Sequence, residues 1–103
     1  MLRLRNSVCI EASAECVWQY LSSVENIDHW VPAIRHAHCE TDQRRGAGTV
    51  RICKLEKFDV REEFLEWEEG RSFKYRGTGA LMMAWATNRW TVEPVGEIGR
   101  AHV

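Results

Sequence analysis

The sequence lacks several features that would identify a class of protein at once. None of its apolar runs approaches the length needed to span a membrane. The charged residues at its start are not followed by the apolar segment of a secretion signal. A predominant charge is also missing, since 14 basic and 15 acidic residues leave a formal net charge of -1. Because phosphate binding needs clustered Lys and Arg, this balance argues against a nucleic-acid partner.

Cysteine motifs are missing as well, although four cysteines are present. Cys9, Cys16, Cys39 and Cys53 form no CxxC pair. In a chain without an export signal, the simplest interpretation is four reduced thiols that pack as small apolar groups, which favours a cytoplasmic location.

The sequence contains no nucleophile elbow, no phosphate loop and no GxGxxG, and the lone GxG at 77–79 is interpreted as a turn. His36 and His38 lie two apart beside Cys39, but the local spacing offers no fourth ligand for zinc, so no metal site is expected. No cofactor is predicted. A histidine in a cavity could serve as a general acid or base, but a solvated strand histidine is the default.

The length of 103 residues, 45% of them apolar, predicts one domain over 1–103 with a modest core. No repeat or low-complexity segment divides it.

The most informative stretch runs from Thr49 to Tyr75 and holds three β-type runs separated by two short turns. If Glu56 and Lys57 form a two-residue turn, four cross-strand pairs follow: Leu55 with Phe58, Cys53 with Val60, Arg51 with Glu62 and Thr49 with Phe64. This register places an apolar set around a single Arg–Glu pair on one side, and most of the charges on the other.

The next turn creates a conflict with that register. Gly70 suits the left-handed position of a three-residue loop, which would pair Trp67 with Arg71 and Leu65 with Phe73. The aromatic side chains would then lie on the face that the first hairpin leaves polar. Either a bulge re-aims the strand between Phe64 and Trp67, or the first register is wrong.

The flanking segments complete an α+β pattern. We expect a first strand over 4–10, a helix capped by Ser13, a second short helical piece over 24–30 that Pro32 ends, and a strand over 33–41. A long strand over 80–93, with Trp90 and Val92 on one face, precedes a return strand over 98–103. The helices are therefore segregated near one end of an antiparallel sheet.

The order of these elements resembles the SRPBCC superfamily (START-like, birch-pollen-allergen-like), and within it the bacterial polyketide cyclase/dehydratase-like branch. The similarity extends over essentially the whole chain. It rests on the order and spacing of short segments, which are ECVWQYLS with VEN and WVP at 15–32, GTVR at 48–51, Glu62, GRSFKY at 70–75 and WTVEP at 90–94.

The resemblance implies a helix-grip fold, in which a curved antiparallel sheet wraps around a long C-terminal helix and an apolar cavity holds a lipid, polyketide or sterol. The family's arginine in the Val-Arg step corresponds to Arg51 and its glutamate on the next strand to Glu62. The sequence departs from the pattern because no C-terminal helix follows the last strand. Either the chain is a fragment, or a partner such as a second copy covers the sheet face.

Arg51 and Glu62 are the candidate catalytic or ligand-orienting residues. They could orient a carbonyl, a carboxylate or an enolate, or form a structural ion pair at the cavity mouth. The candidate ligand-binding residues are chosen by strand face and comprise Trp30, Arg51, Cys53, Phe58, Val60, Glu62, Phe64, Trp85 and Trp90.

Three functions follow from these expectations. The first is a binding or carrier protein for a small hydrophobic ligand. The second is a polyketide cyclase or dehydratase, and the third is a protein-interaction or dimerisation module that uses the open sheet face.

Overall fold

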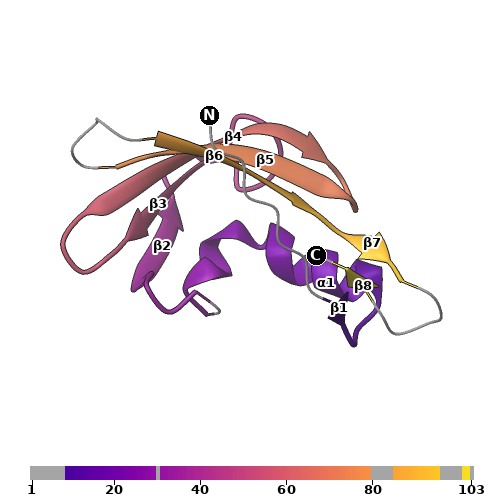
Figure 1. The fold of residues 1–103 in the computed structure, drawn as a ribbon. Helices are drawn as coiled ribbons and strands as arrows, with labels where there is room; N and C mark the ends of the chain where they lie inside the picture. Colours follow the sequence, from indigo (N-terminus) through magenta and orange to yellow (C-terminus); the bar gives the residue numbers. More distant parts are fainter. Residues whose placement is uncertain (1–8, 30, 80–84, 96–100, 103) are drawn as a thin grey trace.

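The fold is α+β and of the helix-grip type, with a curved antiparallel sheet arching over two short helices (Figure 1). The computed structural model describes residues 9–29, 31–79, 85–95 and 101–102. Five strands form the sheet in the order β2-β3-β4-β5-β6, and β1, β8 and β7 form a smaller sheet. The elements are β1 (Cys9–Ile10), α1 (Ala14–Ser22), η1 (Val24–His29), β2 (His36–Cys39), β3 (Val50–Lys54), β4 (Asp59–Glu68), β5 (Ser72–Thr78), β6 (Trp85–Thr91), β7 (Glu93–Pro94) and β8 (Ala101–His102).

The helical part consists of two short helices, as the sequence predicts. The Ser13 hydroxyl caps α1 by accepting a hydrogen bond from the Cys16 amide at 3.1 Å. Val17, Trp18 and Leu21 recur on one face of α1 and are buried against the sheet. The second piece, η1, is a 3₁₀ helix. Both helices lie under the concave side of the sheet (Figure 1).

The register of the first hairpin is confirmed. Arg51 pairs with Glu62 and Cys53 with Val60 in the ladder between β3 and β4. The Leu55 amide also donates a hydrogen bond to the Phe58 carbonyl at 2.9 Å. The charges that face away from the helices form exposed ion pairs across the outer face of the sheet, namely Glu40–Arg61, Glu63–Arg76, Glu66–Lys74 and Glu66–Arg89.

The pairing predicted for the second hairpin is wrong, because the three-residue loop spans 69–71 instead of 68–70 and Glu68 pairs with Ser72. Trp67 pairs with Phe73 instead of Arg71, and the register shifts between Phe64 and Glu66. The extra residue returns the aromatic side chains of both hairpins to the concave face, which settles the conflict between the two registers. Gly70 does occupy the left-handed region, with φ of 83°.

Among the outer elements, the strand that follows η1 is shorter than predicted. The strand expected over 33–41 is limited to β2, and the run expected over 80–93 is described as β6 followed by β7. The expected strands at the two ends of the chain are described as β1 and β8, and residues 1–8, 80–84, 96–100 and 103 lie outside the described residues. Trp90 and Val92 both pack against the core, as expected.

The core divides into two clusters along the concave face. The larger joins α1 to β4, β5 and Val92 around Phe64, which is 1% exposed. The smaller contains Ile27, Ala37 and Cys53, with half-buried apolar neighbours on the hairpin and on the segment after η1. The helices in the described part of the chain are all too short or too polar to cross a bilayer.

Candidate functional site

A buried ion pair occupies the middle of the concave face. The side chains of Arg51 and Glu62 are 3% and 12% exposed, and they project from neighbouring strands at directly paired positions. Arg51 Nε donates to Glu62 Oε1 at 2.8 Å, and Arg51 Nη2 donates to the same oxygen. Two charges removed from water in this way are stable only while both partners are present.

Aromatic rings and a helix carbonyl hold the arginine in place. Its guanidinium carbon lies 5.1 Å from the centre of the Phe64 ring and 5.2 Å from that of Tyr75. Arg51 Nη1 donates to the carbonyl of Val24 at 3.0 Å. The arginine therefore joins the first residue of η1 to the sheet, and each of its three nitrogens already has an acceptor within the protein.

The Cys53 thiol completes this polar centre. Its sulfur donates to Glu62 Oε1 at 3.2 Å, and the side chain is 1% exposed. Burial raises the pKa of Cys53 to about 12, so the thiol stays protonated and unreactive at neutral pH. Burial also raises the pKa of the Tyr75 hydroxyl.

The two carboxylate oxygens of Glu62 differ in their surroundings. Within the described part of the chain, Oε2 accepts no hydrogen bond, while Oε1 accepts several. Gly77 lies opposite Glu62 on β5, and a Cβ added there would lie 3.7 Å from Oε2 and 3.3 Å from Val60 Cγ1. A glycine at this position therefore leaves space beside the carboxylate.

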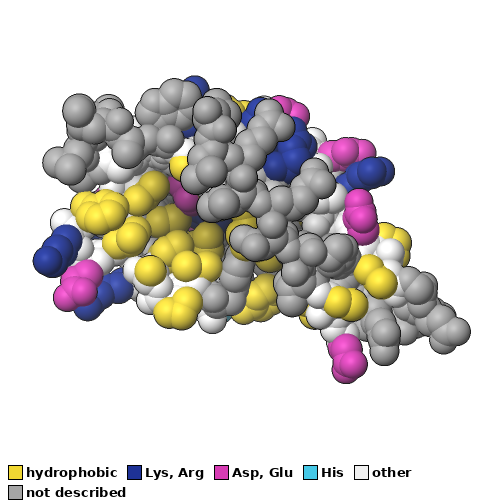
Figure 2. Space-filling model, in the orientation of Figure 1, with side chains coloured by type: hydrophobic (Ala, Val, Ile, Leu, Met, Phe, Trp, Pro, Cys, Tyr) yellow, Lys and Arg dark blue, Asp and Glu magenta, His cyan; other side chains and the backbone are white. Residues whose placement is uncertain are grey.

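Apolar side chains lie on both sides of the ion pair. On the helix side, a crevice has no room for a water molecule and is lined by Leu21, Ile27, Arg51, Phe73, Tyr75 and Trp90. On the other side, the half-buried residues of the smaller cluster are Val31, Ile34, Leu55 and Val60. Figure 2 shows a broad apolar area on the left, over β2, β3 and η1. We call Val31, Ile34, Leu55, Phe58 and Val60 the apolar mouth.

Comparison with known proteins places the chain in a family. The family model described as "Polyketide cyclase / dehydrase and lipid transport" matches residues 1–103. The chain belongs to this family. A search of curated proteins finds no match.

Solved structures agree with the helix-grip fold of this polyketide cyclase/dehydrase and lipid transport family. XoxI from Bacillus cereus superposes with a TM-score of 0.72 at 19% identity, covering 94% of this chain and 67% of its own. A putative uncharacterized protein from Bacillus thuringiensis gives 0.71 at 20%, covering 94% and 69%. A norcoclaurine synthase point mutant from Thalictrum flavum, in complex with a transition-state analogue, gives 0.68 at 16%, covering 94% and 70%. At these identities the likeness concerns the fold alone.

The structure of this family member brings together most of the residues chosen from the sequence. Arg51, Cys53 and Glu62 are in direct contact, and Phe64 lies under the guanidinium. Val60 lies beside them in the smaller cluster, and Trp90 lines the crevice with Arg51. Phe58 lies near the end of the hairpin and is 46% exposed. Trp30 lies outside the described residues, and β6 begins at Trp85, whose side chain is not described.

Sequence reasoning missed Tyr75, Phe73, Gly77 and the Val24 carbonyl as parts of this site. Tyr75 pairs with Phe64 across β4 and β5, and that pairing depends on the bulge. A bulge placed between Phe64 and Trp67 would have indicated Phe73, Tyr75 and Gly77 together, because they alternate on one face of β5. No residue pattern could indicate the carbonyl of Val24.

The expectation about metals concerns the histidines of β2. The His36 and His38 rings stack with their centres 5.8 Å apart. In the described part of the chain, no group of three or more His, Cys, Asp or Glu side chains could hold a metal ion.

Proposed function

We propose that the chain binds a small hydrophobic molecule, such as a lipid, a polyketide or an aromatic compound, against the concave face of its sheet. The observation that carries the proposal is the buried Arg51–Glu62 pair, in which one carboxylate oxygen has no donor among the described residues and lies beside apolar side chains. Apolar contact would supply most of the affinity, and the single polar group would set the orientation. The family description, which includes lipid transport, supports this function.

The existing hydrogen bonds favour a ligand that donates a hydrogen bond to the site. The three nitrogens of Arg51 already face Glu62 and the Val24 carbonyl, so the arginine offers little to a ligand carboxylate or carbonyl. Glu62 Oε2, in contrast, can accept a hydrogen bond from a hydroxyl or an N–H group. A ligand carboxylate placed there would meet a like charge. An apolar alcohol or phenol therefore fits the site better than the corresponding acid.

The apolar mouth gives the ligand a surface to cover. Its half-buried side chains adjoin Cys53 and Ile27, and Phe58 leaves nearly half of its surface in water. Covering apolar surface contributes roughly 25 cal/mol per Å², part of which offsets the entropy lost on binding. Substituting Phe58 with Ser should therefore weaken binding without disturbing the core.

A pair of ligands of equal length tests the proposal. Native mass spectrometry of the purified chain would first reveal any co-purifying hydrophobe. Tryptophan fluorescence titrations would then compare dodecanol with dodecanoate. We expect dodecanol to bind about tenfold more tightly, equivalent to one hydrogen bond of about 1.4 kcal/mol.

Glu62→Gln should reduce the difference in affinity between dodecanol and dodecanoate, since a neutral amide no longer repels the acid. Glu63→Gln is the matched control, because Glu63 is the next residue and faces outward toward Arg76. Failure of either ligand to bind, or equal effects of the two variants, would contradict the proposal.

The same oxygen favours a second candidate function, a cyclase or dehydratase. A carboxylate held in an apolar site and free on one side can accept a proton from an enolisable substrate as a general base. For an enzyme, Glu62→Gln would abolish turnover of a polyketide-type substrate and leave its binding largely intact. For a carrier, no turnover would occur with either protein.

A further inference from the structure

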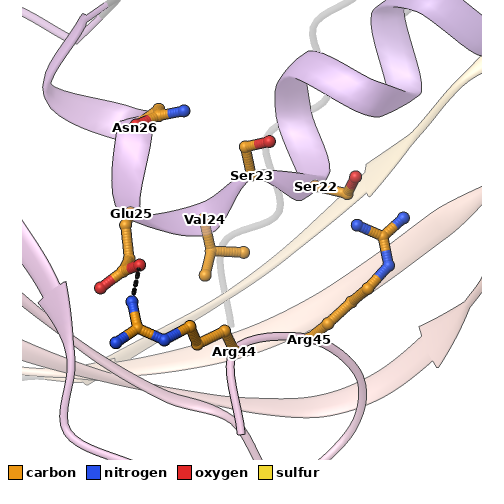
Figure 3. A pocket seen from close by; sticks show the side chains of 7 residues that line it. All are labelled: Ser22, Ser23, Val24, Glu25, Asn26, Arg44 and Arg45. Carbon is orange, nitrogen blue, oxygen red and sulfur yellow. Dashed lines mark hydrogen bonds and ion pairs between the residues drawn. The ribbon is translucent and has the colours of Figure 1, made fainter.

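A second, polar pocket lies next to the Arg51–Glu62 pair, because Val24 lines the pocket and its carbonyl accepts a hydrogen bond from Arg51. It measures about 330 Å³ and lies between residues 22–26, where α1 ends and η1 begins, and the loop that joins β2 to β3. Figure 3 shows the side chains that line it, which are Ser22, Ser23, Val24, Glu25, Asn26, Arg44 and Arg45. The two arginines are adjacent in the sequence, and the hydrophobic ligand site makes no use of them.

The loop that carries both arginines has a defined shape. The side-chain amide of Gln43 donates to the carbonyls of Arg45 at 2.7 Å and Ala47 at 2.8 Å. Gly46 has a φ of 90°, a value that side chains rarely adopt. The Thr41 hydroxyl adds a hydrogen bond to the Gln43 carbonyl at 2.6 Å. The loop therefore holds Arg44 and Arg45 in a preorganised arrangement facing residues 22–26.

Carboxylates fix the two guanidinium groups without using all of their N–H groups. In the described part of the chain, Arg44 uses only Nη1, which binds Glu25 Oε1. Arg45 uses Nε and Nη2, which both bind Glu69. Arginine carries five N–H donors, so Arg44 keeps Nε and Nη2 and Arg45 keeps Nη1 for another acceptor.

The hydrogen-bonding groups that remain in the pocket are mostly donors. Both oxygens of Glu25 are occupied, by Arg44 and by the Cys39 amide at 3.0 Å. Ser22 is buried, at 1% exposed, and its hydroxyl donates only a long hydrogen bond of 3.5 Å to the Gln19 carbonyl. In Figure 3 the guanidinium of Arg45 lies across the pocket from Glu25, near Ser22. A ligand rich in acceptors matches this set.

We propose that this pocket binds a small oxyanion, the carboxylate or phosphate group of a polar ligand. The planar fork of arginine suits both groups, and the hydroxyl of Ser22 can contribute a third donor. Because Glu25 and Glu69 already balance the two positive charges, the affinity depends on N–H geometry more than on net charge. The site is also exposed, so we expect millimolar affinity that falls as ionic strength rises.

Amide NMR of the isotopically labelled chain tests the proposal directly. Inorganic phosphate, acetate and chloride would be titrated separately at constant ionic strength. Saturable shifts should appear at 22–26 and 44–46 with phosphate or acetate, and none with chloride. The stronger of the two oxyanions identifies the ligand group. Absence of saturable shifts with either oxyanion would overturn the proposal.

Two variants separate the pocket from a general charge effect. Arg44→Gln should weaken oxyanion binding about tenfold, and its exposed ion pair contributes little to folding. Arg61→Gln is the control, since Arg61 is an exposed arginine paired with Glu40 on the outer face of the sheet. Equal weakening by both variants would mean nonspecific attraction and would contradict the proposal. Either result leaves the proposed hydrophobic ligand site untouched, because that proposal does not use Arg44 or Arg61.

Discussion

The Arg51–Glu62 pair is the residue-level feature with the greatest expected influence on stability. Both side chains are nearly buried, so removing one leaves the other charged and without its partner. We expect Arg51→Met to lower the free energy of unfolding by about 3–5 kcal/mol in urea denaturation. Adding Glu62→Leu to Arg51→Met should restore much of that loss, because no unpaired charge then remains buried.

Arg61→Met is the control for this prediction. Arg61 and Glu40 form an exposed pair at 3.4 Å, for which a loss of about 0–1 kcal/mol is expected. If Arg51→Met and Arg61→Met cost the same, the Arg51–Glu62 pair would not be buried as described.

A buried hydroxyl provides a prediction of the opposite sign. Thr49 is 0% exposed, and its Oγ1 has no hydrogen-bond partner among the described residues. Thr49→Val keeps the shape of the side chain and removes the unsatisfied group, so the free energy of unfolding should rise by about 1 kcal/mol. Thr41→Val should be destabilising instead, because the Thr41 hydroxyl donates to the Gln43 carbonyl and accepts from the Val50 amide. A lower melting temperature for Thr49→Val would show that its hydroxyl is satisfied.

The cysteines should differ in reactivity according to burial. Cys9 and Cys16 are exposed, whereas burial raises the pKa of Cys53 to about 12. A thiol-specific disulfide reagent at pH 8 should therefore modify Cys9 and Cys16 rapidly, and Cys53 only after unfolding in urea. Mass spectrometry of the labelled peptides identifies the sites. Rapid labelling of Cys53 in the folded protein would mean that the concave face opens readily.

At the scale of elements, the Glu69 carboxylate joins three separate segments. It accepts hydrogen bonds from Arg45 on the β2–β3 loop, from Trp18 on α1 and from Trp67 on β4. The hydrogen bond from Arg45 is the largest cause that lowers the pKa of Glu69 to about 2, from 4.5. Because the folded pKa is lower than the unfolded one, Glu69 stabilises the fold above about pH 4.5. This contribution is lost as the pH falls toward 2.

Glu69→Gln should therefore lower the stability at neutral pH and have little effect near pH 2. The loss should be modest, since the side chain of Glu69 is 57% exposed and solvent screens the charges. Glu68→Gln is the control, because within 9–29, 31–79, 85–95 and 101–102 no hydrogen bond or ion pair involves the Glu68 carboxylate. Urea denaturation between pH 2 and 7 measures the difference in the free energy of unfolding between the wild type and each variant. A difference for Glu69→Gln that does not change with pH would contradict this assignment.

Local patterns account for the elements that the sequence predicts well. The alternation around Glu56 and Lys57 determines which residues of β3 and β4 share a face, so the contact between Arg51 and Glu62 follows from it. The bulge in β4 cannot be deduced from such alternation. The strand keeps one register with β5 up to Phe64 and another from Glu66 onward, and each register is consistent by itself. The positions of Tyr75 and Gly77 depend on that bulge, so the side of the site built by β5 was missed.

Whether a side chain is covered depends on the whole molecule and cannot be obtained from strand alternation. Phe58 has the position expected of a buried residue, next to Val60 in the first hairpin, yet it is 46% exposed. The sequence pattern gives the face on which a side chain lies, but not the neighbour that removes it from water. Figure 2 shows the consequence, a continuous apolar area over one end of the molecule.

For the whole molecule, we propose that a second copy of the chain covers the apolar mouth when no ligand is bound. Phe58 and the half-buried side chains around it would pair across a two-fold axis, since a symmetric contact uses the same patch twice. Sedimentation velocity should then show a dimer at high micromolar concentration, and Phe58→Ser should weaken dimerisation at least tenfold. Tyr20→Ser is the control, because Tyr20 is equally exposed, at 49%, but lies on α1 away from the mouth.

Ligand binding and dimerisation would compete, because both cover the same side chains. Adding dodecanol should therefore shift the wild-type chain from dimer toward monomer, and the alcohol should bind more weakly at high protein concentration. A chain that stays monomeric at every concentration would contradict the dimer and leave the hydrophobic ligand as the only proposed cover. A dimer that takes up dodecanol without dissociating would instead place the subunit contact on another face, with the mouth open in both copies.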